Sequence, residues 1–311
     1  MEPIVLDTDP GIDDALAMML AFNSPEISVS AVTTVAGNVS HAKAHVNAKK
    51  LLEYLGEYDI PVCEGAERPL LRGVSHVEDF HGDLGLGDAI LPEPGLPTHE
   101  LNAVEMIIRK ADELMDKLTI VSIGPLTNIA SAILADPELP LKINKLVIMG
   151  GAYQLTPYGH GNSTAVAEFN IWHDPEAAKI VFDSDIKIVA VGLDVTTNPR
   201  NRLNRRVFRE ICSTSTENAG LVESLCRELV DRLNGCSLHD PMATAYLIKP
   251  GLFKLEKHRV KVETRGELTR GMTVVDRRYG EQMTNDHSAD IVVEVDGRGF
   301  LDIFLERVVG G

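Results

Sequence analysis

Short runs of β-branched and other apolar residues alternate with helix-forming segments through the first two-thirds of this chain, and this alternation restricts the fold more than any other feature. It is typical of βαβ units, so we expect an α/β fold with an open, mostly parallel, Rossmann-like sheet and helices on both faces. The expected strands are residues 3–6, 27–35, 61–63, 118–123, 145–149 and 186–191, and the expected helices are 13–22, 40–56, 103–115 and 175–182.

Two long segments, residues 65–98 and 151–173, interrupt the alternation and are rich in glycine and polar residues. Loops of this length inside a compact domain usually bind ligands or cover a site. The region from 204 to 239 has a helical pattern. Later runs with a strand pattern, expected at a sheet edge or in a small appended sheet, are 258–263, 272–275 and 291–295. No repeat or linker divides the chain, so we expect a single domain over residues 1–311.

The composition indicates a globular protein and excludes two classes of partner. Hydrophobic residues make up 44% of the chain and charged residues 24%, which is ordinary usage for a globular domain. The formal net charge is −16, so the chain repels phosphate backbones and anionic lipid. We therefore expect neither nucleic acid nor a membrane surface as a partner, whereas a single nucleoside in a pocket remains compatible.

The cysteines and the apolar runs bear on the compartment. Cys63, Cys212, Cys226 and Cys236 are widely spaced, which predicts free thiols in a reducing environment. The first residues lack the basic and apolar regions of a signal peptide, and no apolar run approaches the length of a membrane span. We expect a cytoplasmic protein.

The densest chemical signal follows the first predicted strand, where four aspartates occur within eight residues: Asp7, Asp9, Asp13 and Asp14. One or two aspartates at a helix start are usually caps. Four crowded carboxylates repel one another unless a cation holds them, and oxygen ligands suit Ca²⁺ or Mg²⁺. The turn at Pro10 allows Asp9 and Asp14 to face one point, so we expect a metal site.

Further polar residues occur where a parallel sheet should expose them, because such sheets bind ligands at the carboxyl ends of their strands. Asn38 and the segment 122–128 each follow a predicted strand, and the segments 168–170 and 239–241 come later in the chain. Each alone has an ordinary structural interpretation, and a lone histidine such as His239 is more often a satisfied structural residue than a catalytic one. Their expected meeting at this edge of the sheet is what indicates a site.

These motifs together resemble the calcium-dependent nucleoside hydrolases, of the inosine–uridine-preferring type. The matching segments, in the family's order and spacing, are DTDPGIDDA, TTVAGNV, FHGDLGLGD, IGPLTNIA, VIMGGAY, AEFNIWHDPEAA and LHDPMATAY. They cover nearly the whole chain from Ile4 to Tyr246, and the resemblance is weaker in the C-terminal third. It implies hydrolysis of ribonucleosides to ribose and a free purine or pyrimidine base, in nucleoside salvage and catabolism.

The resemblance also implies a role for each site residue. Ca²⁺ would be held by Asp9, Asp14, Asp240 and the main-chain carbonyl of Ile123. Asp9 would be the general base on the metal-bound water, and His239 would protonate the leaving base. The implied ribose-binding residues are Asp13, Asn38, Asn162, Glu168 and Asn170, and His81 would line the base pocket. The family further implies a homo-oligomer, a dimer or a tetramer.

The preferred base is less constrained. The purine-specific branch stacks tryptophans on the base, but the one tryptophan here, Trp172, lies close after Asn170 instead of in the His81 loop. The pyrimidine-preferring and broad-specificity branches often have tyrosine in the helix before His239, whereas residues 225–232 contain no aromatic side chain. We expect a broad inosine–uridine activity.

Two alternatives remain open from the sequence. One is a phosphatase in which Asp7 and Asp9 form an Asp-x-Asp nucleophile and acid with Mg²⁺, although this leaves the segments around Glu168 and His239 without a role. The other is a nucleoside sensor that has kept the pocket and lost turnover. It is disfavoured because both Asp9 and His239 are present.

Overall fold

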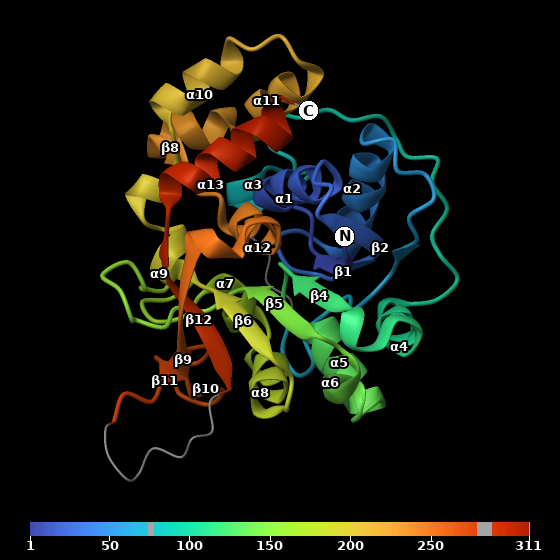
Figure 1. Ribbon diagram of the computed structural model, residues 1–311, viewed down its shortest axis with the longest axis vertical. Helices are drawn as coiled ribbons and strands as arrows, with labels where there is room; N and C mark the ends of the chain where they lie inside the picture. The colour runs from blue at the N-terminus through green and yellow to red at the C-terminus, as the bar shows by residue number, and fades with distance from the viewer. Residues whose placement is uncertain (74–77, 279–287, 311) are drawn as a thin grey trace.

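An eight-stranded sheet runs through the centre of the protein in the order β3-β2-β1-β4-β5-β6-β12-β9 (Figure 1). The computed structural model describes residues 1–73, 78–278 and 288–310. Neighbouring strands pair in parallel except β12 and β9, which are antiparallel. The strands are β3 (Val62–Cys63), β2 (Ile27–Thr34), β1 (Glu2–Thr8), β4 (Thr119–Ser122), β5 (Lys145–Met149), β6 (Ile188–Val191), β12 (Ala289–Val295) and β9 (Phe253–His258). The mostly parallel sheet expected from the sequence is confirmed.

The late strands correct one expectation. The run at 291–295 was expected at an edge or in an appended sheet, but β12 lies inside the main sheet, parallel to β6 on one side. The actual edge strand is β9, whose mostly exposed pattern gives no strong strand signal. The expected run at 258–263 divides between β9 and the small appended sheet of β10 (Val260–Val262) and β11 (Thr273–Val275).

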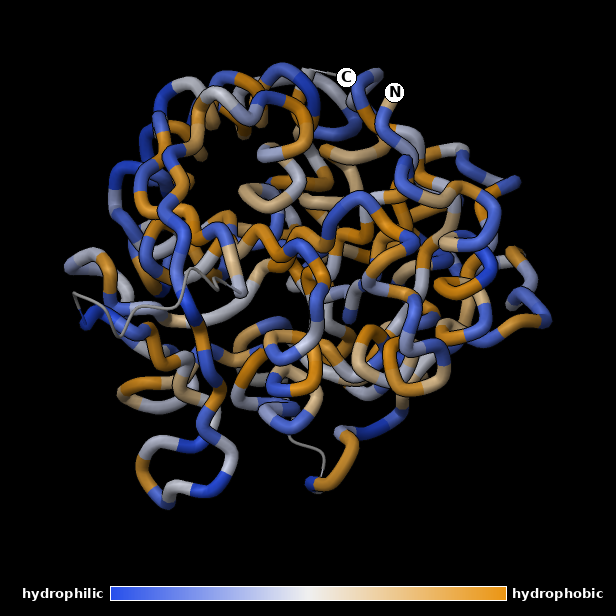
Figure 2. The backbone as a smooth tube through the Cα atoms, turned by 60° about the horizontal axis from the view of Figure 1, so that its bottom comes forward, coloured by the Kyte–Doolittle hydropathy of each residue, from blue (hydrophilic) through white to orange (hydrophobic). Residues whose placement is uncertain are grey.

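Helices cover both faces of the sheet because successive strand residues point to opposite sides. In β1, Ile4 and Leu6 belong to one hydrophobic core and Val5 to the other. Figure 2 shows hydrophobic segments running through the centre of the molecule. One core contains residues of α1 (Ile12–Phe22), α2 (His41–Tyr54), α11 (Glu217–Leu233), α12 (His239–Ile248) and α13 (Gly297–Phe304). The other contains residues of α4 (Ala103–Leu114), α5 (Thr127–Ala135) and α8 (Pro175–Asp183).

Short elements complete the fold, and two of them occur where loops were expected. α3 (Glu78–His81) lies within 65–98, and α7 (Phe169–His173) lies within 151–173. α7 forms because the Glu168 side chain caps its first backbone N–H groups, a local signal without periodicity. The others are α6 (Leu139–Lys142), α9 (Leu193–Thr196), α10 (Arg205–Cys212), β7 (Leu203–Asn204), β8 (Gly235–Cys236), three 3₁₀ turns (Met115–Lys117, Pro199–Asn201, Pro250–Leu252) and a π turn (Leu305–Val309). Residues 74–77 of the first segment lie outside the described residues.

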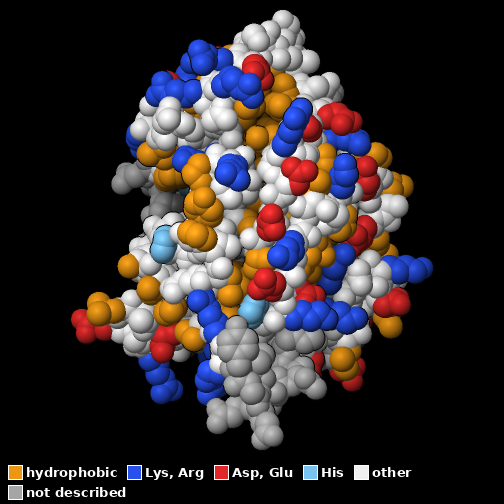
Figure 3. Space-filling view, turned by 60° about the vertical axis from the view of Figure 1, so that its left-hand side comes forward, with side chains coloured by type: hydrophobic (Ala, Val, Ile, Leu, Met, Phe, Trp, Pro, Cys, Tyr) orange, Lys and Arg blue, Asp and Glu red, His pale blue; other side chains and the backbone are white. Residues whose placement is uncertain are grey.

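The surface carries charges of both signs, and the cysteines form no disulfide among the described residues. The face seen in Figure 3 carries basic and acidic side chains interspersed with apolar ones. All four cysteines are free, as expected. Within the part of the chain that the structure describes, no helix combines the length and the apolar character needed to cross a bilayer.

Candidate active site

A pocket of about 180 Å³ lies at the carboxyl ends of the parallel strands, where β1 leads through a short turn into α1. Open α/β sheets bind ligands at this edge. Most residues predicted for the site line the pocket: Asp13, Asn38, His81, Ile123, Asn162, Glu168, Asn170, His239 and Asp240. The other two, Asp9 and Asp14, are fully buried. The fold therefore brings segments from residue 9 to residue 240 to one place.

Asp14 is held by four hydrogen bonds. Its Oδ1 accepts from the Thr8 hydroxyl at 2.6 Å and from the Asp9 backbone N–H at 3.2 Å. Its Oδ2 accepts from the Gly11 N–H at 3.0 Å and from Nδ2 of Asn38 at 2.8 Å. Asp14 thus caps the start of α1 and also belongs to the acidic cluster, so its capping role is compatible with metal binding.

Asp9 keeps one carboxylate oxygen without a partner. Its Oδ2 accepts a hydrogen bond of 2.6 Å from the backbone N–H of Asn38. Its Oδ1 is buried, and no described residue donates to it. The loops around it come unusually close, since a Cβ added at Gly37 would lie 1.9 Å from Asp9 Oδ2 and one at Gly124 would lie 2.6 Å from Oδ1. A buried oxygen without a donor is costly unless a cation or a water molecule completes it.

Carboxylates crowd this end of the pocket. Ligand atoms of Asp13, Asp14 and Asp240 all lie within 4.8 Å of one another. Burial raises the pKa of Asp240 well above its usual range, and the charges of the neighbouring carboxylates raise it further. Burial, followed by the charge of Asp14, raises the pKa of Asp13 to about 8. This compact group contains Asp13, whereas the predicted ligand set contains Asp9 in its place. Such a cluster fits a metal ion that takes oxygen ligands.

Two residues at the start of α7 form the wall beside the cluster. The Glu168 carboxylate accepts from the backbone N–H groups of Gly151, Asn170 and Ile171. Asn170 Nδ2 donates to the carbonyl oxygens of Ile123 at 2.8 Å and Met149 at 3.1 Å. The Ile123 carbonyl therefore sits at the pocket, where it was predicted to act as a ligand.

Asn162 and Asn38 occupy different depths of the same pocket. Asn162 is exposed at the rim, on the loop before α7. Asn38 is 8% exposed and donates from Nδ2 to Asp14 while its backbone N–H donates to Asp9. The pocket can therefore contact a polar ligand from its floor and from its rim.

Two histidines face the pocket in restrained orientations. His239 Nδ1 lies 2.8 Å from the Thr196 hydroxyl at the end of α9, which leaves Nε2 for a ligand. Burial, followed by the charge of Arg202, lowers the pKa of His239 to about 4. His81 Nδ1 accepts from the Ile12 backbone N–H at 3.1 Å, so the proton of its neutral ring is on Nε2. Burial lowers the pKa of His81 to about 3.

Asp7 stands behind the pocket and joins three elements. The strand register places it between Thr33 on β2 and Ser122 on β4. It accepts hydrogen bonds from both hydroxyls and from Nδ2 of Asn128 on α5, and it is fully buried. Because both its oxygens are bonded and neither is exposed, Asp7 cannot attack a phosphate ester. The phosphatase alternative is thereby excluded.

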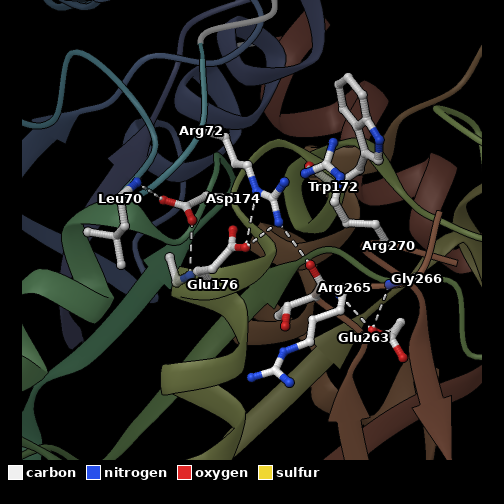
Figure 4. A network of polar contacts seen from close by, with 11 residues as sticks. Leu70, Arg72, Trp172, Asp174, Glu176, Glu263, Arg265, Gly266 and Arg270 are labelled. Carbon is white, nitrogen blue, oxygen red and sulfur yellow. Dashed lines mark hydrogen bonds and ion pairs between the residues drawn. The ribbon is translucent and has the colours of Figure 1, made fainter.

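Figure 4 shows the polar contacts that anchor the segment around Arg72 to α8 and to the loop between β10 and β11. Arg72 donates to the Glu176 carboxylate at 2.9 Å and to the Thr264 carbonyl at 3.0 Å. Nearby, the Arg270 guanidinium lies 5.1 Å from the centre of the Trp172 ring. Trp172 is not among the residues that line the pocket, so it does not supply a stacking surface for a base.

The end of the pocket near His81 contains residues that sequence reasoning missed. Phe80 lines the pocket and packs against the His81 ring with centroids 5.1 Å apart. The Arg232 guanidinium lies 5.8 Å from the centre of the Phe80 ring. Phe80 could have been found from its place beside His81, whereas Thr196, which orients His239, had only its position just after a strand as a signal. This end is mainly apolar and comes from helices and loops.

Comparisons with known proteins agree with this geometry. Residues 4–302 match the family described as inosine-uridine preferring nucleoside hydrolase. The pyrimidine-specific ribonucleoside hydrolase RihA of Escherichia coli is 43% identical over 311 residues, covering 98% of each chain, and RihA of Escherichia fergusonii is equally similar.

Solved structures are similar along the whole chain. The purine-preferring ribonucleoside hydrolase of Gardnerella vaginalis is 31% identical, with a TM-score of 0.89, and covers 99% of this chain and 98% of that chain. A plant nucleoside hydrolase is also 31% identical, with a TM-score of 0.88, and covers 100% and 99% of the two chains. The fold is therefore the α/β nucleoside hydrolase fold. This chain belongs to the inosine-uridine preferring nucleoside hydrolase family and is a ribonucleoside hydrolase, which cleaves the N-glycosidic bond of ribonucleosides.

Proposed function

We propose that this ribonucleoside hydrolase uses Ca²⁺, held by Asp9, Asp14, Asp240 and the Ile123 carbonyl. The observation that carries the proposal is the buried Oδ1 of Asp9, which receives no hydrogen bond from the described residues, on a carboxylate close enough to feel the charges of Asp14 and Asp13. Carboxylates combined with a main-chain carbonyl suit Ca²⁺, which accepts an irregular set of oxygen ligands. When bound, the cation would lower the pKa of a water molecule at the site.

Asp9 is the general base of the proposed reaction. Its Oδ1 is buried and receives no hydrogen bond from the described residues, so this oxygen is available to take a proton from the attacking water. The water oxygen forms a bond to C1′ as the bond from C1′ to the base nitrogen breaks. The electron pair of the broken bond stays on the base, and the imidazolium form of His239, which its lowered pKa makes a stronger acid, donates the proton that neutralises it.

The ribose is bound by the polar wall of the pocket. Glu168 is fixed by three backbone N–H groups, and Asn170 is fixed by two carbonyl oxygens. We propose that these two residues, with Asp13, Asn38 and Asn162, hydrogen-bond the ribose hydroxyls. Because the side chains are already held in place, little ordering is needed when the sugar binds.

We propose uridine and cytidine as the preferred substrates, with inosine also hydrolysed. The relatives that are 43% identical are described as pyrimidine-specific, whereas the purine-preferring structure is only 31% identical. Family resemblance also supports one domain over residues 1–311, a homo-oligomer (dimer or tetramer), and a cytoplasmic role in nucleoside salvage.

A substrate panel with metal exchange tests the proposal. Ribose release is measured for uridine, cytidine, inosine, adenosine, guanosine and thymidine, before and after chelation and after return of Ca²⁺ or Mg²⁺. The expected result is loss of activity on chelation and recovery with Ca²⁺. Full activity after exhaustive chelation would contradict the metal proposal, and faster inosine than uridine hydrolysis would contradict the base preference.

A further inference from the structure

Arg202 lies next to the end of the pocket that contains His239. It belongs to none of the motifs found in the sequence. It immediately precedes β7, which pairs with β8 through Leu203 and Cys236. Its Nη2 donates to the Gly235 carbonyl at 2.9 Å. Because the chain continues from β8 directly to His239, this small ribbon places the guanidinium beside the start of α12.

The same guanidinium has a second donor that is unused. Nε of Arg202 is buried, and no described residue accepts its hydrogen bond. Leaving a charged donor buried without an acceptor costs free energy, so such a group is retained where a ligand can complete it. The bond from Nη2 to Gly235 explains how Arg202 is held, but it leaves Nε unexplained.

The cavity beside Arg202 shares three of its lining residues with the active-site pocket. Arg202 lines a side cavity of about 30 Å³. Asp13, Phe80 and His239 line both this cavity and the main pocket. The remaining wall includes the apolar side chains of Leu229 and Leu233 from α11. A cation surrounded by apolar groups acts more strongly on a nearby charge than it would in water.

We propose that Arg202 binds the departing base, with its Nε–H donating to a hydrogen-bond acceptor of the base and its charge stabilising the base as it leaves. The inference rests on the proposed function. It names the substrate class as ribonucleosides whose base has a carbonyl oxygen beside the glycosidic nitrogen, as uracil and cytosine do.

Arg202 neither gains nor loses a proton in the proposed step. As the bond from C1′ to nitrogen breaks, its electron pair spreads over the ring nitrogen and the adjacent carbonyl oxygen of the base. Arg202 remains protonated throughout because guanidinium does not ionise in proteins. The proton that finally neutralises the base comes from His239. Arg202 therefore supplies electrostatic stabilisation, and His239 supplies the proton transfer.

The test compares two leaving groups in three variants. Arg202→Gln removes the charge, Arg202→Lys keeps the charge without the Nε–H donor, and Arg209→Gln is the matched control. Arg209 is an exposed arginine of α10 that lines neither cavity, and its Nε donates to the Arg205 carbonyl of the same helix. The substrates are uridine and p-nitrophenyl riboside, whose leaving group departs readily as an anion. Thermal unfolding with and without Ca²⁺, and competition by ribose, report whether each variant keeps its fold and sugar site.

Arg202→Gln should lose about 10²-fold in kcat/KM on uridine, the order seen when one transition-state donor is removed. The loss on p-nitrophenyl riboside should be at least tenfold smaller, Arg202→Lys should be intermediate, and Arg209→Gln should be close to wild type. Equal losses on both substrates, or no loss, would overturn the role of Arg202. Failure of the wild type to hydrolyse uridine would instead overturn the proposed function.

Discussion

The proposed sugar end and the proposed base end of the pocket are built in different ways. At the sugar end, Asp14 and Glu168 each accept several hydrogen bonds, and most of the donors are backbone N–H groups at strand ends and helix starts. At the base end, Phe80 and Leu229 come from α3 and α11, outside the sheet. The first end depends on the sheet itself, and the second depends on segments added around it.

This difference explains how one fold hydrolyses different nucleosides. The proteins similar to this chain include a pyrimidine-specific enzyme and a purine-preferring one, and both align along nearly its whole length. A sugar end held by the backbone of the sheet can stay constant while helices and loops change the base end. The following predictions separate the two ends by experiment.

The largest expected effect comes from the sugar end. Removing the 2′-hydroxyl of the substrate leaves pre-positioned groups such as Glu168 and Asn170 without their partner. A site built to hydrogen-bond a hydroxyl rejects the analogue that lacks it by about 10⁴-fold. Comparison of kcat/KM for uridine and 2′-deoxyuridine measures this effect. Similar values would show that these residues do not bind the ribose.

Asp9→Ala should reduce kcat by about 10³-fold, within the range for a lost general base. The loss should be the same for uridine, inosine and p-nitrophenyl riboside, because every substrate needs the attacking water. Asp9→Asn, which keeps the shape of the side chain, should lose as much. Calorimetric titration with Ca²⁺ is expected to show weaker binding in both variants. A loss confined to one substrate would place Asp9 at the base end instead.

His239→Ala should reduce kcat/KM by about 10²-fold on natural nucleosides, the lower end of the range for a general acid. The loss on p-nitrophenyl riboside should be much smaller because its leaving group needs no proton. Thr196→Val removes the hydroxyl that lies 2.8 Å from His239 Nδ1 and should give a weaker form of the same pattern. If His239→Ala slows both substrates equally, His239 only supports Asp240 and the metal site.

The smallest expected effect is on the free energy of unfolding at acidic pH, and it arises at His45. His45 contacts the hydroxyls of Thr34 at 3.1 Å and Thr98 at 2.9 Å, and burial lowers its pKa from 6.5 to about 4. Between these two values the unfolded chain binds a proton on His45 that the folded chain does not. The free energy of unfolding should therefore decrease as the pH falls from 6.5 to 4.

His45→Gln should remove part of this decrease, measured by urea unfolding between pH 4 and pH 7.5. His160→Gln is the matched control because that side chain is exposed. An unchanged pH profile in His45→Gln would show that this histidine does not contribute to the acid sensitivity.

The sequence by itself determined the parallel α/β sheet, the helices on its two faces and the carboxylates at the end of β1. These follow from local signals, since strand and helix periods, caps and turns are written in neighbouring residues. Its pattern also placed Asn38 after a strand, whereas Glu168 was expected in a loop and caps α7 in the structure. The convergence of these residues in one pocket could be inferred because parallel strands end at a common edge.

Which of these groups meet, and how each is held, depends on the packing of the folded chain. The insertion of β12 between β6 and β9, the free oxygen of Asp9 and the approach of Arg202 to His239 all depend on contacts between distant parts of the chain. No local pattern marks such contacts, because strand order and side-chain burial result from packing of the whole core. For the same reason the base end, formed by segments outside the sheet, could be assigned only from the folded chain.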